Sequence, residues 1–254
     1  MKEWITNRNP IFEALSTGRR HFFNLLVQQD LKNEGKLKEI IELARQSKVP
    51  VRLANKQQLG QIDHNHMGLA LEVSGYPYAA LEDLFAYAKK RGEPAFFLLL
   101  DLIQDPQNLG SLLRTAEIMG VHGVIIPSSQ AAQVTASVVH ASSGATEHLL
   151  IAQYNLVQAI ERLKKDFDIW VYGLDADPKG RTPEQLNMTG GVALVVGNEG
   201  EGLRRLVRKN CDEIMRLPQY GKVNSLNAAA AGSIALYLAR QARANSTATK
   251  TKLS

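Results

Sequence analysis

The stretch LPQYGKVNSLNAAAAGSIALYLARQ, residues 217–241, begins as the end of a strand and a loop and continues as an alanine-rich helix. Ser225 and Asn227 stand at the mouth of this helix, shortly after a turn that contains Gly221. Helix capping explains one polar residue at such a position more easily than it explains two. The small side chains of residues 228–231 allow close packing against this helix. The stretch therefore fits either a tightly packed helix, at a dimer interface for example, or one wall of a ligand site.

The segments that precede this helix alternate between apolar strands and helices. We expect strands at residues 96–102, 123–127, 148–152, 169–175, 192–197 and 213–218. Nearly continuous apolar strands that alternate with helices are typical of a parallel sheet covered on both faces. The sequence thus predicts an α/β fold for this half of the chain.

The N-terminal half predicts a second, smaller α/β domain. Short helices and strands alternate from Asn9 to Gly75, and glycine and proline then interrupt the periodic pattern near residues 75–77 and again near 92–94. The last residues are polar and predict a frayed end. We therefore expect a domain at 1–75, a linker at 76–94, a second domain at 95–241 and a disordered tail at 242–254.

Composition limits the class of protein. The chain has 254 residues, 44% of them hydrophobic, which is ample for a buried core. A formal charge of +5 favours polyanionic partners, although charge alone is weak evidence. Cys211 is the sole cysteine, which excludes an internal disulfide framework. No apolar run has the length of a membrane span, and we expect a cytoplasmic protein without a membrane partner.

A first polar cluster lies in DLIQDPQNLGSLLRTAEIMG, residues 101–120, directly after a predicted strand. Asn108 falls in the turn and Arg114 on the helix that follows. Ligands bind at the carboxyl ends of strands in open parallel sheets, so both residues are candidates for a site. The alternative is that Asn108 caps the helix and Arg114 is a surface or salt-bridged residue.

A second cluster is the glycine-rich segment VALVVGNEGEGLRRL, residues 192–206. Gly197, Gly200 and Gly202 permit close backbone approach to a ligand at the start of a helix. Their order is G-x-x-G-x-G, whereas the dinucleotide fingerprint is G-x-G-x-x-G. Glu199 and Glu201 would also repel a pyrophosphate, so a dinucleotide site is disfavoured.

Two histidines in DHNHM, His64 and His66, lie at alternate positions. No cysteine or carboxylate set completes a metal site around them. We expect no metal, and we favour a structural or RNA-facing role for these side chains.

Taken together, DPQNLGSLLRTAEIMGVHGVIIP, VVGNEGEGL and LPQYGKVNSLNAAAAGSIALY resemble the three ordered motifs of the SpoU/TrmH family of RNA ribose 2′-O-methyltransferases. The resemblance covers residues 95–241, and the segment through HMGLALEV is similar to the ribosomal-protein-like substrate domain of many members. It implies a SPOUT fold, with a parallel sheet and a C-terminal trefoil knot, that binds S-adenosylmethionine and works as a homodimer. The run of alanines at 228–231 departs from the Ser or Thr that the family often has there.

The resemblance also implies roles for individual residues. The methyl donor would lie against Gly197, Gly202, Leu217, Gly221 and Leu226. The family's polar catalytic positions fall on Asn108, Arg114, Glu199, Ser225 and Asn227. Arg114 is the position to which activation of the ribose hydroxyl is usually assigned, but a charged guanidinium has no acceptor. Either it is transiently deprotonated, or it clamps the adjoining phosphate and stabilises the developing alkoxide while another group accepts the proton.

We therefore expect an S-adenosylmethionine-dependent RNA 2′-O-methyltransferase, with a guanosine of 23S rRNA as the favoured target and no DNA partner. A tRNA 2′-O-methyltransferase is the nearest alternative. A non-catalytic RNA-binding or ribosome-assembly protein of the same fold is the second, and a nucleotide-dependent oxidoreductase, based on the glycine-rich segment alone, is the third.

Overall fold

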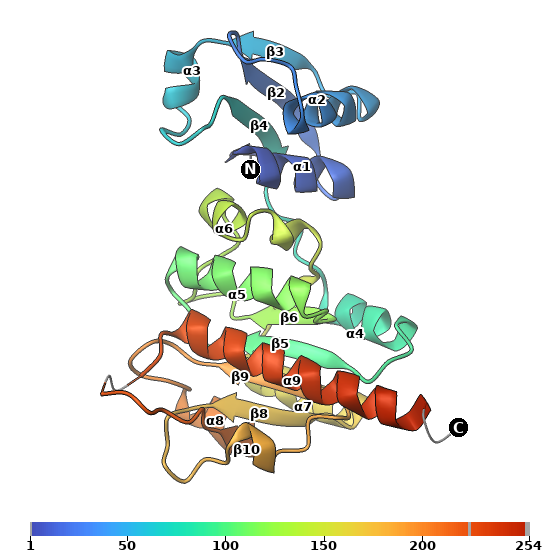
Figure 1. Cartoon of the computed structure of the whole chain (residues 1–254), viewed down its shortest axis with the longest axis vertical. Helices are drawn as coiled ribbons and strands as arrows, with labels where there is room; N and C mark the ends of the chain where they lie inside the picture. The colour runs from blue at the N-terminus through green and yellow to red at the C-terminus, as the bar shows by residue number, and fades with distance from the viewer. Residues whose placement is uncertain (1, 223–224, 252–254) are drawn as a thin grey trace. The chain divides into compact units, whose positions relative to one another are not determined.

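The computed structural model describes residues 2–222 and 225–251, with side chains as far as residue 245. The chain forms two compact units: unit 1 (Met1–Pro77 and Gln133–His148) and unit 2 (Tyr78–Ala132 and Leu149–Ser254). Each unit has its own sheet (Figure 1). Unit 1 therefore includes a segment that the sequence places in the middle of the second domain.

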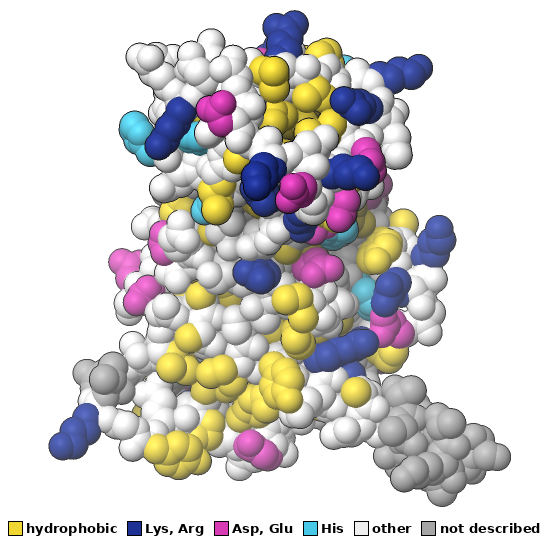
Figure 2. All heavy atoms as spheres, turned by 45° about the horizontal axis from the view of Figure 1, so that its top comes forward, with side chains coloured by type: hydrophobic (Ala, Val, Ile, Leu, Met, Phe, Trp, Pro, Cys, Tyr) yellow, Lys and Arg dark blue, Asp and Glu magenta, His cyan; other side chains and the backbone are white. Residues whose placement is uncertain are grey.

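Unit 1 is a small α/β unit built on a four-stranded sheet in the order β1-β4-β2-β3. Its elements are β1 (Lys2–Thr6), α1 (Arg8–Thr17), β2 (Phe22–Gln28), α2 (Lys36–Gln46), β3 (Val51–Ala54), α3 (Lys56–Gly60), β4 (Leu69–Ser74), α6 (Ala136–Ala141) and the 3-10 helix η1 (Ala145–Glu147). Strand β1 is absent from the sequence-based expectation. It pairs antiparallel with β4, as does β2, whereas β2 and β3 are parallel. In the upper part of Figure 2, charged and hydrophobic side chains of this unit are interspersed over the surface.

The segment Gln133–His148 is tied to unit 1 by buried polar contacts. Arg20 donates two hydrogen bonds to the carboxylate of Glu147, from Nε at 2.9 Å and from Nη2 at 2.8 Å. It also contacts the carboxylate of Glu3. The Tyr76 hydroxyl donates to the backbone oxygen of Thr146 at 3.0 Å, and burial raises the pKa of Tyr76. Loss of either partner of such a buried ion pair would leave a buried charge with less compensation. The segment that carries Glu147 therefore folds as part of unit 1.

Unit 2 contains a six-stranded sheet in the order β10-β8-β9-β5-β6-β7, and every strand pair in it is parallel. Its elements are α4 (Leu81–Lys90), β5 (Phe96–Leu100), α5 (Pro106–Ile118), β6 (Gly123–Ile126), β7 (Ile151–Gln153), α7 (Leu156–Phe167), β8 (Trp170–Leu174), the 3-10 helix η2 (Pro183–Gln185), β9 (Val192–Val196), α8 (Arg205–Asn210), β10 (Glu213–Met215) and α9 (Ala228–Thr251). The expected α/β fold with a parallel sheet is confirmed. The knot that the resemblance implies stays a prediction.

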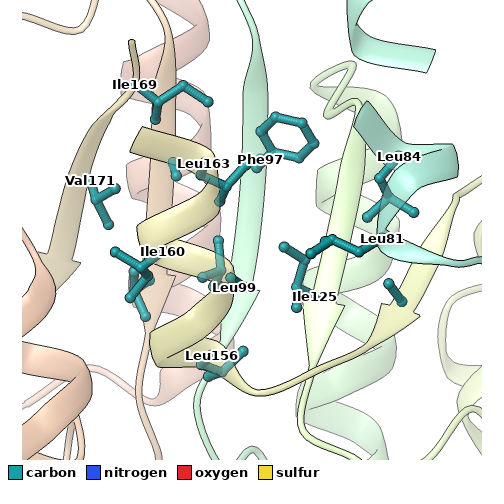
Figure 3. Packing of buried hydrophobic residues seen from close by; sticks show 14 of the residues in the cluster. Leu81, Leu84, Phe97, Leu99, Ile125, Leu156, Ile160, Leu163, Ile169 and Val171 are labelled. Atoms are coloured by element: carbon teal, nitrogen blue, oxygen red, sulfur yellow. The ribbon is translucent and has the colours of Figure 1, made fainter. Parts of the chain in front are cut away.

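The core of unit 2 shows why the strands read as continuous apolar runs. On one face, Leu156, Ile160 and Leu163 of α7 pack against Phe97 and Leu99 of β5 (Figure 3). Helix α4 adds further apolar side chains to the same cluster. On the other face, α5 and α9 lie against each other and cover the sheet (Figure 1). Burial on both faces leaves no polar alternation along the central strands.

Two features of unit 2 differ from the expected domain boundaries. The expected linker at 76–94 contains α4, whose Leu81, Leu84 and Phe85 are buried in the core, because its apolar residues recur at helical spacing. The expected tail from residue 242 continues α9 as far as Thr251. Buried Arg243 anchors this extension by donating to the backbone oxygens of Ala95, at 3.2 Å, and Gly190, at 2.6 Å. Residues 252–254 of the expected tail lie outside the described residues.

Candidate active site

A cavity of about 240 Å³ lies at the carboxyl ends of β8, β9 and β10 in unit 2. Three loops and the start of α9 form its walls. The lining residues are Leu174, Asp175, Ala176, Val196, Gly197, Asn198, Glu199, Gly200, Glu201, Gly202, Met215, Leu217, Gln219, Ser225, Leu226, Ala228 and Ala231. This is the edge at which parallel α/β sheets bind ligands.

The loop after β9 is closed by its own backbone. Asn198 N–H donates to the oxygen of Gly202 at 3.1 Å, and Gly202 N–H donates back to the oxygen of Asn198 at 3.0 Å. A Cβ at Gly197 would lie 2.3 Å from the backbone carbon of Gly202, so only glycine fits there. The backbone of Gly197 and Gly202 is therefore closely packed at this wall of the cavity.

Two side chains from the end of β5 and from α5 hold this loop. Asp101 is fully buried and accepts from Arg204, from the backbone N–H at 2.8 Å and from Nε at 2.6 Å. Asn108 Nδ2 donates to Glu199 Oε2 at 3.3 Å. Asp101 is not among the residues predicted from the sequence, although a carboxylate directly after the apolar run FFLLL is a usable signal.

Asn108 does not cap α5, which was the alternative role for this residue. The helix is capped by Asp105, which accepts from the backbone N–H groups of Gln107, at 3.1 Å, and Asn108, at 3.2 Å. Pro106 occupies the first turn, where its missing N–H has no intrahelical partner to lose. The side chain of Asn108 is therefore not the cap, and it is directed to Glu199 instead.

The segment GLDADPKG, residues 173–180, begins at the end of β8 and contributes to the cavity. Asp175 lines the cavity and accepts from the backbone N–H of Asp177 at 2.9 Å. Arg208 of α8 forms ion pairs with both carboxylates. A backbone hydrogen bond from Lys179, followed by the charge of Arg208, lowers the pKa of Asp177. Glu199 and Glu201 place two exposed carboxylates on the rim of the same cavity.

The two polar residues at the start of α9, Ser225 and Asn227, have different roles in the structure. Asn227 Oδ1 accepts from the backbone N–H of Ala230 at 2.7 Å, which is the hydrogen bond of a helix cap. Ser225 and Leu226 line the cavity, together with the small side chains of Ala228 and Ala231. The two polar residues therefore have different positions: one caps the helix and the other faces the cavity.

The structure brings together six of the ten residues named from the sequence. Those lining the cavity are Gly197, Glu199, Gly202, Leu217, Ser225 and Leu226. The other four lie outside its lining. Asn108 is bonded to Glu199, Asn227 caps α9, Arg114 is exposed on α5, and Gly221 is exposed on the loop before α9.

Within residues 2–222 and 225–251, no three His, Cys, Asp or Glu side chains are arranged to hold a metal ion. In the same part of the chain, no helix combines the length and apolar character that crossing a membrane requires.

Comparison with known proteins identifies relatives of both units. Residues 95–237 match the model of the SpoU rRNA methylase family, and residues 7–79 match a model described as RNA 2′-O ribose methyltransferase substrate binding. YacO of Bacillus subtilis, named as a TrmH family tRNA/rRNA methyltransferase, is 37% identical over 92% of this chain and 94% of its own length. A tRNA/rRNA methyltransferase of Mycobacterium sp., named as uncharacterized, is 37% identical over 95% of this chain and 77% of its own.

Solved structures share the fold. The SpoU methyltransferase AviRb from Streptomyces viridochromogenes, in complex with AdoMet, superposes with a TM-score of 0.80 at 24% identity, over 96% of this chain and 91% of its own. An AdoMet-bound rRNA methyltransferase from Sinorhizobium meliloti gives 0.77 at 22% identity, over 94% and 87% of the two chains.

The parallel sheet, the cavity at its carboxyl edge and the matches of both units define the class of protein as an RNA methyltransferase. Within that class, the chain belongs to the SpoU rRNA methylase family.

Proposed function

We propose that this chain transfers the methyl group of S-adenosylmethionine to the ribose 2′ hydroxyl of a nucleotide in structured RNA, and that its target is a guanosine of 23S rRNA. The observation that carries the proposal is the cavity at the carboxyl ends of β8, β9 and β10, in a chain of the SpoU family. The substrate-binding match at residues 7–79 supports an RNA substrate.

The cavity fits the chemistry of this donor. S-adenosylmethionine supplies an electrophilic methyl group on a positively charged sulfonium, and the rim carries the carboxylates of Glu199 and Glu201. Opposite charges attract strongly in a partly desolvated site. Leu217 and Leu226 offer apolar surface to a flat base. The glycine loop admits close approach to its backbone groups.

The catalytic roles follow from what each side chain can donate or accept. Arg114 holds the phosphate next to the target ribose and stabilises the oxygen from which the proton leaves. Glu199, which lines the cavity and is held by Asn108, is the acceptor that the geometry offers for that proton. Deprotonated Arg114 remains the alternative acceptor. In both versions the main task of the site is to align the 2′ oxygen with the methyl group.

Incubation of the protein with radiolabelled donor and unmodified rRNA or tRNA tests the proposed function. We expect label in the ribose of a 23S rRNA guanosine, detected by nuclease digestion and chromatography. Label in tRNA alone would reassign the substrate. Tight RNA binding without transfer of label would favour the non-catalytic RNA-binding alternative.

The role of Arg114 is tested by Arg114→Ala and Arg114→Lys. We expect transfer to fall by at least about a hundredfold in Arg114→Ala, while calorimetry shows nearly unchanged donor affinity. Partial activity in Arg114→Lys would support the charge-stabilising role, because a lysine keeps the positive charge. Equal loss of donor binding and transfer would show that Arg114 belongs to the donor pocket or to the folded core.

We also propose that two copies of the chain associate through α5 and α9. Thr115 and Ser233 join these helices by a hydrogen bond of 2.9 Å between their hydroxyls. About one turn further along each helix, Ile118 and Tyr237 are 63% and 51% exposed, and Ile234 is also exposed. Hydrophobic side chains are visible over unit 2 in the lower part of Figure 2. An exposed apolar patch of this kind is suited to a second copy.

Sedimentation equilibrium tests the dimer. We expect a dimer at micromolar concentration, and a monomer for the Ile118→Glu, Tyr237→Glu double variant. A monomeric wild-type protein would contradict the proposal.

We further propose that the protein is cytoplasmic, which its single cysteine and proposed RNA substrate support.

A further inference from the structure

One end of the unit 1 sheet gathers three segments, which we call the loop end: the loops at residues 29–35 and 61–68, and the start of α3 at residues 55–58. The N–H of Gln28 donates to the oxygen of Gly68 at 2.9 Å, and the N–H of Gln29 donates to the oxygen of Ala54 at 3.1 Å. Because β3 and β4 lie on either side of β2, about 10 Å separates Ala54 from Gly68. The three segments of the loop end therefore form one continuous surface.

The 61–68 loop is held in place by its own polar groups. Asp63 accepts from the Thr6 hydroxyl and from the backbone N–H of Asn65, the latter at 2.9 Å. The buried Nδ1 of His66 accepts from the N–H of Gly68 at 2.8 Å. These bonds confirm a structural role for His66, one of the two roles considered for the histidines of this segment. They also make the loop rigid.

The same loop presents other side chains to solvent. His64 and Asn65 are exposed, and Met67 is 68% exposed. Met67 also has a φ of 47°, a left-handed conformation that is uncommon for any residue other than glycine. A strained backbone that displays an apolar side chain to water contributes nothing evident to the fold. Such an outlier is a reason to look for a function.

The charges of the loop end are unevenly distributed. Asp30 and Glu34 lie on the 29–35 loop beside Lys32, whereas exposed Lys56 begins α3 next to the 61–68 loop. The carboxylate of Asp63 is already engaged by Thr6 and Asn65. A polyanion would therefore approach the side of the loop end formed by residues 55–58 and 61–68.

We propose that this side of the loop end receives an unpaired nucleotide of the RNA substrate, with His64 and Met67 against the face of its base, Asn65 at its polar edge and Lys56 at an adjoining phosphate. Sequence-specific proteins read RNA mainly at unpaired bases, which stack on side chains such as histidine and expose their edges to amides. Methionine packs readily against flat, polarizable groups. The inference rests on the proposed RNA methyltransfer and adds where unit 1 holds the substrate.

Met67→Gly is a discriminating variant because it removes the side chain and also relieves the left-handed backbone. The melting temperature should stay the same or rise. In the full-length protein, we expect the KM for unmodified rRNA to increase at least about fivefold in Met67→Gly and about tenfold in His64→Ala. The kcat at saturating RNA and the affinity for S-adenosylmethionine should not change, because neither residue belongs to the cavity. His64→Phe should recover most of the loss, because it retains an aromatic face.

Lys56→Gln and Lys48→Gln form a matched pair. Both lysines are exposed in unit 1, but Lys48 follows α2 and precedes β3, at the opposite end of the sheet. We expect weaker RNA binding and a shallower salt dependence for Lys56→Gln alone. RNA affinities of Met67→Gly, His64→Ala and Lys56→Gln within twofold of wild type would overturn the proposal.

Filter binding of the same rRNA without donor separates this inference from the proposed reaction. Loss of binding in the loop-end variants supports the RNA surface even if no methyl transfer is detected. Methyl transfer by wild type together with unchanged binding by every variant removes the surface and leaves the reaction intact.

Discussion

At the scale of single residues, the structure separates pairs that look equivalent in sequence. Ser225 and Asn227 are both polar and both near the start of α9, yet Ser225 lines the cavity and Asn227 caps the helix. Asn108 and Asp105 show the same division at α5, where the aspartate is the cap and the asparagine bonds Glu199. Sequence position identified the right neighbourhood in both cases, but hydrogen-bond geometry assigned the roles.

Asn227 provides a test of this assignment. We expect Asn227→Ala to lower the free energy of unfolding by about 1 kcal/mol, because the N–H of Ala230 loses its acceptor. Asn227→Asp keeps an acceptor oxygen at the helix start and should retain wild-type stability in urea titrations. If Asn227 only caps α9, the aspartate variant also retains kcat. An inactive but stable aspartate variant would instead show that the amide group contacts substrate.

At the scale of elements, short connections control the site. The loop after β9 is shaped by Gly197 and by the bonds of Asn198 with Gly202, and it is anchored through Asp101. The apolar strands and their helices were predictable because burial imposes a regular pattern. The anchors were not, because Asp101 and Arg204 are 103 positions apart in sequence.

Gly197→Ala should disrupt this loop. The added Cβ would meet the backbone of Gly202, which cannot swing aside as a side chain would. We expect the dissociation constant for S-adenosylmethionine to rise at least about tenfold, measured by calorimetry, with the far-ultraviolet circular dichroism of the fold retained. Gly190→Ala is the matched control, because a Cβ there meets nothing within 4 Å. Equal donor affinity in both variants would remove this loop from the donor site.

Glu93, which precedes β5, predicts a pH dependence of stability. Burial opposes its ionisation, but hydrogen bonds from Arg91 and His122 prevail and lower the pKa of Glu93 from 4.5 to about 2. A depressed carboxylate pKa stabilises the folded state above pH 4.5, and the contribution is lost as the pH falls towards 2. Since Glu93 is partly exposed, we expect about 1–2 kcal/mol at pH 7.

Urea unfolding of wild type and Glu93→Gln at pH 7 and pH 3 measures this contribution. The difference in unfolding free energy between the two proteins should shrink by more than half at pH 3, because Glu93 of the unfolded chain, with its ordinary pKa of 4.5, binds a proton there while the folded carboxylate still resists it. A difference independent of pH would mean that the ionised form of Glu93 has no role in stability.

At the scale of the whole molecule, the chain passes between its units three times, after residues 77, 132 and 148. The N-terminal unit is therefore connected to unit 2 by more than one chain segment. It incorporates Gln133–His148, a segment that leaves the unit 2 sheet after β6 and returns to it before β7. The buried pair of Arg20 with Glu147 holds this segment.

Glu147→Ala tests that arrangement. Removing Glu147 leaves the buried guanidinium of Arg20 with Glu3 as its remaining acidic partner, and we expect a loss of about 3 kcal/mol. Hydrogen exchange should accelerate in β1 and β4 of unit 1, although residue 147 lies between strands of unit 2 in sequence. Glu161→Ala, at an exposed position of α7, serves as the control. Faster exchange in β5 and β9 instead of β1 and β4 would place the segment with unit 2.

The sequence by itself determined the fold class, the order of most elements and the six cavity residues that motif resemblance marked. The fold class and the element order follow from local patterns, because burial sets the period of apolar residues. The six cavity residues follow from the resemblance to the SpoU/TrmH motifs. Only the tertiary structure decided that Asp101 anchors the glycine loop, that residues 133–148 belong to the first unit, that the helix within the expected linker packs into the core of unit 2, that the expected tail is helical, and that Asn227 is a cap. Each depends on a hydrogen bond or a packing contact, many between residues distant in the chain, and such pairings leave no periodic signal in a single sequence.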